Sequence, residues 1–296
     1  MRVTIFGAII LWGFLTQVNG QDCMGKNYPL PVLSTEVKMK MENQLDEARQ
    51  VYLKDTLNAD ALIWYGRRYG YLGKYQEAIE LFSQGVERFP GDARFLRHRG
   101  HRAITLRCNQ QAIIDLTQAA ELTQAKSDEI EPDGMPNVQN IPTSTLKGNI
   151  WYHLGLALYL EKDFYRAGVV YKSCLKFSTN PDMYMATAYW LYITLRRDGK
   201  DLEAKALLET VEVGLPLIEN EEYYEMLLLY KGVLREDQLM DKLKSSGGSR
   251  ENATLGYAMG MYFQLKNQPE KAKALYKEVL SGNQWSSFGF IAAEKE

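Results

Sequence analysis

The chain has 296 residues, of which 46% are hydrophobic and 24% are charged, the composition of a soluble globular protein. Its formal net charge of −2 at pH 7 excludes a general electrostatic attraction to nucleic acid or to anionic membranes. Three cysteines are too few for a framework of several disulfides.

The first twenty residues, 1–20, have the pattern of a secretory signal peptide. Arg2 supplies the positive charge, residues 5–18 form an apolar run, and Gly20 closes a small-residue cleavage site. The run is shorter than the ~20 apolar residues that span a bilayer. We therefore expect a secreted or periplasmic protein that begins at Gln21 and has no integral membrane segment after cleavage. A membrane anchor at the same place is the alternative.

Residues 21–58 are predicted to form an N-terminal segment followed by a capping helix. Leu45, Ala48 and Tyr52 recur at helical spacing within a charged stretch. Near the start of this segment, Cys23 could pair with Cys108, and free thiols are the other interpretation.

A pattern of small and bulky apolar residues then recurs with a period of 34. In the segment that begins at Ala59, Gly66 and Ala78 are small, and Phe82 is bulky. Matching segments begin at Ala93, Gly148, Met185 and Ala253. Each unit reads as two amphipathic helices that cannot bury their apolar faces alone, so neighbouring units must stack.

The spacing of these units predicts the organisation of the chain. Repeats 1 and 2 cover 59–126, an inserted loop covers 127–147, and repeats 3 and 4 cover 148–218. A degenerate repeat and linker cover 219–252, and repeat 5 with a C-terminal capping helix covers 253–296. The insertion is the largest departure from the period, and it is rich in acidic residues.

These residues and spacings resemble the tetratricopeptide repeat (TPR) family. The blocks 97–102, 131–134, 140–145, 151–155 and 285–294 also resemble a group of exported bacterial TPR proteins. The resemblance implies an all-α solenoid, a right-handed superhelix of helix-turn-helix units with capping helices. It also implies a scaffold that binds a protein or peptide on its concave surface, rather than an enzyme.

Positions that face inward in the family carry basic and aromatic residues here. Arginine suits the bidentate capture of carboxylates, and aromatic side chains supply contact area. We therefore expect a concave groove that binds an anionic or carboxylate-bearing segment of a partner. The predicted lining residues are Trp64, Arg67, Arg94, Arg97, His98, His101, Asn149, Tyr152, His153, Tyr189 and Trp190.

Three other interpretations stay open at this stage. The arginines of 97–102 could form a solvated helix face. The acidic loop 127–147 could fill the groove as a lid or an internal ligand, leaving the scaffold to act through other faces. His98, His101 and His153 could form the metal site of a hydrolase, although flanking arginines would repel a cation. We expect no catalytic residue, metal, cofactor or nucleic-acid partner.

Overall fold

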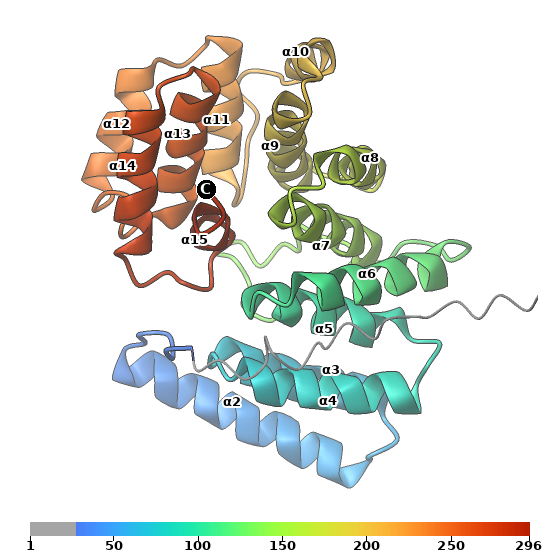
Figure 1. Cartoon of the computed structure of the whole chain (residues 1–296). Coiled ribbons are helices and arrows are strands. Elements are labelled where there is room, and N and C mark those ends of the chain that lie inside the picture. The colour runs from blue at the N-terminus through green and yellow to red at the C-terminus, as the bar shows by residue number, and fades with distance from the viewer. Residues whose placement is uncertain (1–27) are drawn as a thin grey trace, which may run out of the picture.

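The computed structural model describes residues 28–296 and shows α-helices packed one after another in a curved stack (Figure 1). The predicted signal peptide and Cys23 lie outside these residues. The helices are α2 (Thr35–Lys54), α3 (Ala59–Tyr71), α4 (Tyr75–Arg88), α5 (Ala93–Thr105), α6 (Asn109–Thr123), α7 (Leu146–Leu160), α8 (Phe164–Leu175), α9 (Pro181–Arg197), α10 (Asp201–Glu209), α11 (Glu221–Lys231), α12 (Glu236–Ser245), α13 (Ala253–Leu265), α14 (Pro269–Leu280) and α15 (Phe288–Ala293).

The helices pair as the repeat pattern predicts. Within repeats α3 packs on α4, α5 on α6, α7 on α8, α9 on α10 and α13 on α14. Between repeats α4 packs on α5, α6 on α7 and α8 on α9, while α2 packs on α3 at the N-terminal side. The fold is therefore an all-α solenoid.

The recurring glycine of the pattern has a direct physical cause. A Cβ on Gly66 would lie 2.5 Å from Phe82 of the paired helix, and one on Gly155 would lie 2.6 Å from Tyr171. The aromatic ring thus sits on the glycine backbone in both repeats. Close helix crossing depends on the absence of a side chain there.

Residues 219–252 form α11 and α12, although they lack most of the repeat signature. Helix α11 packs against α9 and α13, so it joins the fourth repeat to the fifth. The linker before it is fixed by Asp182, whose buried carboxylate accepts hydrogen bonds from the backbone N–H groups of Ile218 (3.1 Å) and Glu219 (2.7 Å).

The segment 285–296 does more than cover the last repeat. Helix α15 packs on α13 and α14, and in Figure 1 it lies between the C-terminal repeats and α5. Trp285 stacks on Tyr28 with ring centroids 4.8 Å apart. Arg107 donates to Glu294 (2.8 Å) and to the carbonyl of Trp285 (2.8 Å). The end of the described chain therefore contacts the first two repeats.

Changing Gly289 to Ala should displace α15. Its Cβ would lie 2.3 Å from the carbonyl oxygen of Ala253 and 2.9 Å from the Cα of Thr254, and backbone cannot move aside as a side chain can. We expect a loss of about 1–3 kcal/mol in the free energy of unfolding and faster amide exchange over 285–296. Gly91→Ala is the matched control, because nothing lies within 4 Å of its added Cβ. Unchanged exchange in Gly289→Ala would contradict this account of α15.

Within residues 28–296, no helix is long and apolar enough to cross a membrane. Cys174 is a free, buried thiol, and burial raises its pKa to about 12. Cys108 is disulfide-bonded, so it is not one of the free thiols. The pairing considered from the sequence involves Cys23, which lies outside the described residues.

Candidate functional site

The first arginine of the basic helix is already neutralised by its neighbours. Asp92 caps α5 by accepting from the backbone N–H of Arg94 (3.0 Å). The Arg94 guanidinium lies 2.6 Å from Asp92 Oδ2 and 2.5 Å from Asp60 Oδ1. The hydrogen bond to Asp92 raises the pKa of Arg94 by more than burial lowers it. Arg94, which was predicted to bind an anion of the partner, is therefore already paired with two carboxylates of this chain.

The acidic insertion folds back onto the next arginine of α5. Arg97 Nε lies 2.8 Å from Glu131 Oε2, and both side chains are less than one tenth exposed. Asn149 of α7 donates to the same carboxylate oxygen (3.1 Å), and His98 Nε2 lies 3.9 Å from Oε1. The loop is fixed by the hydrogen bond from Glu131 N to the carbonyl of Ser144 (3.1 Å). A carboxylate therefore occupies this part of the groove, and it belongs to the chain itself.

The backbone beyond Glu131 is held by arginines of α3. Arg67 Nη2 donates to the carbonyl of Pro132 (2.7 Å), and Arg68 Nη1 donates to the carbonyl of Gly134 (3.1 Å). A Cβ on Gly134 would lie 1.7 Å from the hydroxyl of Tyr71, so this position admits only glycine without displacing the ring. Residues 131–134 are thus bound through one carboxylate and two carbonyls, as a peptide ligand would be.

An open cleft remains at the mouth of the groove. It measures about 260 Å³ and lies between α3, α5 and the loop. Trp64, Arg67, Arg94 and His98 line it on the helix side, and residues 129–132 line it on the loop side. The Arg67 guanidinium lies 4.3 Å from the centroid of the Trp64 ring, a cation–π contact. The accessible part of the predicted groove is therefore confined to the first two repeats.

The three histidines gather behind this cleft. The rings of His101 and His153 lie 4.2 Å apart, and Phe288 of α15 lies 5.6 Å from each. His153 Nδ1 hydrogen-bonds the carbonyl of Asn149 (2.6 Å). Residues 28–296 contain no group of three or more His, Cys, Asp or Glu that could hold a metal ion. The structure thus does not assemble the three-histidine site of a hydrolase.

Burial and the nearby arginine charges lower the pKa of all three histidines well below 6.5. They are neutral in the folded protein, whereas in the unfolded chain they take up protons near pH 6.5. Stability is therefore fully present above that pH and should fall as the pH drops below it.

We expect the free energy of unfolding to decrease by up to about 1.4 kcal/mol per pH unit for each histidine. Urea unfolding at pH 7.5, 6.5 and 5.5 measures this, and His153→Gln should reduce the slope by about one histidine's share. The arginines facing the rings, Arg97 and Arg102, stay charged over this range. A flat profile between pH 7.5 and 5.5 would contradict the neutral, buried state.

The predicted aromatic lining is buried. Tyr189 and Trp190 are 0% exposed, and Tyr152 is 7% exposed. Tyr189 stacks on Tyr223 of α11 (5.0 Å), and Trp190 stacks on Tyr257 of α13 (5.9 Å). These three residues belong to the core instead of an open groove, because the last repeats fold across them.

Other groups at the site were not predicted as lining residues. Glu131 and Arg68 bind within the groove, Arg102 faces it, and Phe288 packs against His101. Arg102 and Glu131 lie in the basic block and the acidic insertion, so the sequence carried a signal for both. No local pattern indicated that α15 would meet α5 and α7.

Paired helices that cross closely at glycines define a helical-repeat solenoid. The family model of the tetratricopeptide repeat matches residues 59–92, and similar solved structures are TPR proteins. Residues 59–92, which form α3 and α4, therefore match one tetratricopeptide repeat.

Several solved structures resemble this fold at low sequence identity. YrrB, described as a TPR protein with an unusual peptide-binding site, is 13% identical, with 79% of this chain and 91% of that chain covered and a TM-score of 0.44. Pseudomonas aeruginosa pilF is 14% identical, with 85% and 89% covered and a TM-score of 0.48. Comparison with curated proteins gives no match. These likenesses concern the fold alone.

Proposed function

We propose that this TPR scaffold binds an acidic, carboxylate-bearing segment of a protein partner at the position now taken by residues 131–134. The supporting observation is the way this segment is held: Glu131 on Arg97, and the carbonyls of Pro132 and Gly134 on Arg67 and Arg68. Charged, forked donors of this kind suit carboxylate recognition. The open cleft beside Trp64 gives a partner segment an entry.

The internal segment acts as a competitor in this proposal. A tethered ligand has an effective concentration in the millimolar range, and the apparent affinity of an outside ligand falls with the fraction of free sites. Weakening the internal segment should therefore strengthen partner binding. The partner must present a Glu with flanking carbonyls, as the loop does.

A peptide-binding measurement tests this proposal. The probe is a fluorescent peptide with the sequence of residues 127–136, and binding to the full chain is followed by anisotropy. We expect Glu131→Gln to bind it at least about tenfold more tightly than the unchanged chain, because the isosteric amide loses the charge that holds the loop. Arg67→Gln added to Glu131→Gln should remove that gain.

Glu87→Gln is the matched control, because Glu87 is exposed on α4 and lines neither the cleft nor the loop. A peptide with Gln in place of the central Glu should bind weakly to every variant. Equal affinity of the unchanged chain, Glu87→Gln and Glu131→Gln would overturn the proposal.

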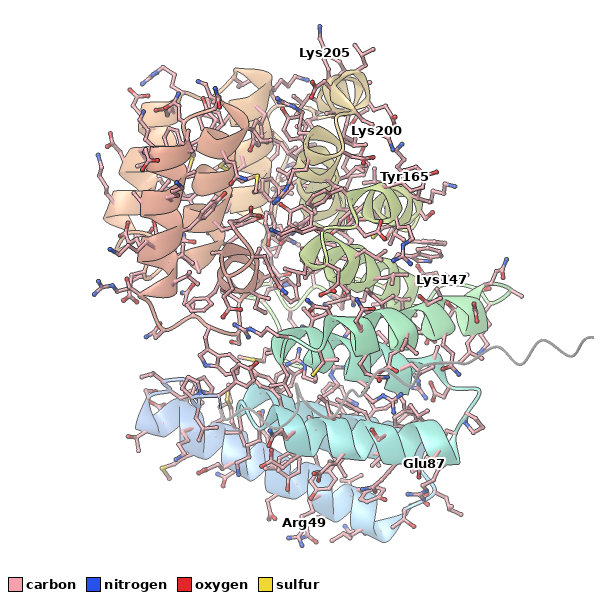
Figure 2. All side chains as sticks on the ribbon, in the orientation of Figure 1. Arg49, Glu87, Lys147, Tyr165, Lys200 and Lys205 are labelled. Atoms are coloured by element: carbon pink, nitrogen blue, oxygen red, sulfur yellow. The ribbon has the colours of Figure 1, made fainter. Side chains whose placement is uncertain are left out.

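A second candidate surface lies on the outer side of the stack. An apolar groove of about 660 Å³ runs between α6, α7 and α8, with Trp151, Leu154 and Val169 in its lining. Lys147 and Tyr165, labelled in Figure 2, also line it. Val169 is 50% exposed, so Val169→Asp should disrupt a partner bound here while leaving the peptide assay unchanged.

We further propose that the protein works outside the cytoplasm. The apolar leader at 5–18 and the disulfide at Cys108 support this, since disulfides persist in oxidising compartments. Fractionation of cells that produce the chain tests it. Recovery of the chain in the cytosol with Cys108 reduced would contradict an exported scaffold.

A further inference from the structure

A smaller cavity adjoins the open cleft and shares Arg67, His98 and Glu131 with it. It measures about 110 Å³ and lies between α3, α5 and the side chain of Glu131. Arg67, Arg97, Arg102 and Tyr71 line it, together with two histidines. Since one water takes about 30 Å³ of the liquid, the cavity has room for a small polyatomic ion.

The charges around this cavity do not balance. Three guanidinium groups face it, and Glu131 is its one lining carboxylate. Among residues 28–296, Arg67 and Arg102 have no carboxylate within ion-pair distance, whereas Arg99 on the same helix as Arg102 is paired with Asp115 at 2.7 Å. Three positive charges and one negative charge leave an excess of two.

The other groups nearby do not remove this excess. Arg97 Nη1 lies 3.1 Å from His98 Nδ1, and Arg102 Nη2 lies 2.8 Å from His101 Nδ1, so neutral imidazoles accept from the arginines. Asp133 is close enough to Arg67 to feel its charge but does not line the cavity. Buried charges are normally paired. An unbalanced set of guanidiniums around a cavity therefore favours the binding of an anion.

We propose that this cavity binds a tetrahedral oxyanion with two negative charges, phosphate or sulfate. The guanidiniums are planar forks that come from two helices, and the Tyr71 hydroxyl adds a further donor. Four oxygens can meet donors from several directions, whereas a carboxylate offers only two. The charge of such an ion equals the excess. This site shares Arg67, Arg97 and Glu131 with the proposed partner site, but it binds an ion instead of a peptide, so it does not rest on the partner proposal.

Glycines on α3 shape the room for this ion. Gly66 and Gly70 both line the cavity, and a Cβ on Gly70 would lie 3.4 Å from Arg102 Nη1. The absence of side chains there lets the Arg102 guanidinium reach across toward α3. The cavity thus depends on the glycine backbone of α3 as well as on the arginine side chains around it.

Titration calorimetry of the purified chain with sodium phosphate or sodium sulfate tests the proposal, at constant ionic strength set with sodium chloride. We expect saturable binding of one ion per chain, and no comparable binding of acetate. Arg102→Gln and Arg67→Gln should each weaken binding by about tenfold or more, the effect of losing a hydrogen bond to a charged group. Arg67→Gln still tests the proposal if Arg102→Gln does not fold, because Arg67 is partly exposed and its replacement should not prevent folding.

Arg49→Gln is the matched control, because it removes the same charge from an exposed position on α2 (Figure 2). It should leave oxyanion affinity unchanged. The proposal is overturned by an absence of saturable phosphate and sulfate binding, by acetate binding as tightly, or by equal affinity in Arg67→Gln and Arg49→Gln. The peptide assay uses a different probe on the unchanged chain, so loss of one kind of binding while the other is retained shows which of the two proposals fails.

Discussion

Changing Glu131 to Ala should destabilise the protein by about 3–5 kcal/mol, the cost of leaving a buried charge without its partner. Arg97 is 7% exposed and loses its one carboxylate contact in this variant. Urea unfolding measures the loss. The double variant Arg97→Met with Glu131→Ala should recover much of the lost stability, because an apolar side chain leaves no unpaired charge.

Glu87→Ala is the control for this pair, since Glu87 is exposed on α4 (Figure 2) and should change stability by no more than about 0.5 kcal/mol. If Glu131→Ala changed the free energy of unfolding as little as Glu87→Ala does, Glu131 would not form its ion pair with Arg97. A double variant as unstable as the sum of the single changes would show that the two side chains act independently.

Changing Trp190 to Ala should also cost about 3–5 kcal/mol, as expected for a fully buried aromatic residue. The Trp190 ring packs edge-on against Tyr159 (5.2 Å) and stacks on Tyr257 of α13 (5.9 Å). Removing it would therefore leave a cavity between two repeats. Urea unfolding measures the loss. A residue lining an open groove would instead change partner binding with little effect on stability.

Tyr165→Ala is the comparison for Trp190, because Tyr165 is 64% exposed. We expect a change of no more than about 0.5 kcal/mol. If Trp190→Ala and Tyr165→Ala had similar stabilities, Trp190 would not be a core residue.

The repeat architecture was predictable because it depends on local spacing. Gly66 and Phe82 are 16 positions apart, and their contact recurs in the later repeats with the same separation. The basic stripe on α5 was also predictable, since helical geometry places Arg97 and His101 on one side. The acidic loop was foreseen as an internal ligand, and the contact between Glu131 and Arg97 agrees with that alternative.

The burial of Tyr189 and Trp190 was not predictable from the same spacing. The family pattern gives each residue a direction relative to its own helix, but the curvature of the whole stack decides what lies opposite. Here α11 and α13 cover the residues that an open superhelix would expose. The curvature of the stack is the sum of many small rotations between repeats, so it cannot be predicted from any single residue.

The docking of segment 285–296 on the first repeats has a consequence for how the chain folds. An open array of repeats can fray from either end, because each unit contacts only its neighbours. Here Arg107 and Glu294 are joined across 187 positions, and Arg197 pairs with Glu296. Such distant contacts raise the contact order and slow the formation of the last native contacts. Unfolding from this end must first break contacts with α5 and α7, which couples the two ends of the array in one cooperative transition.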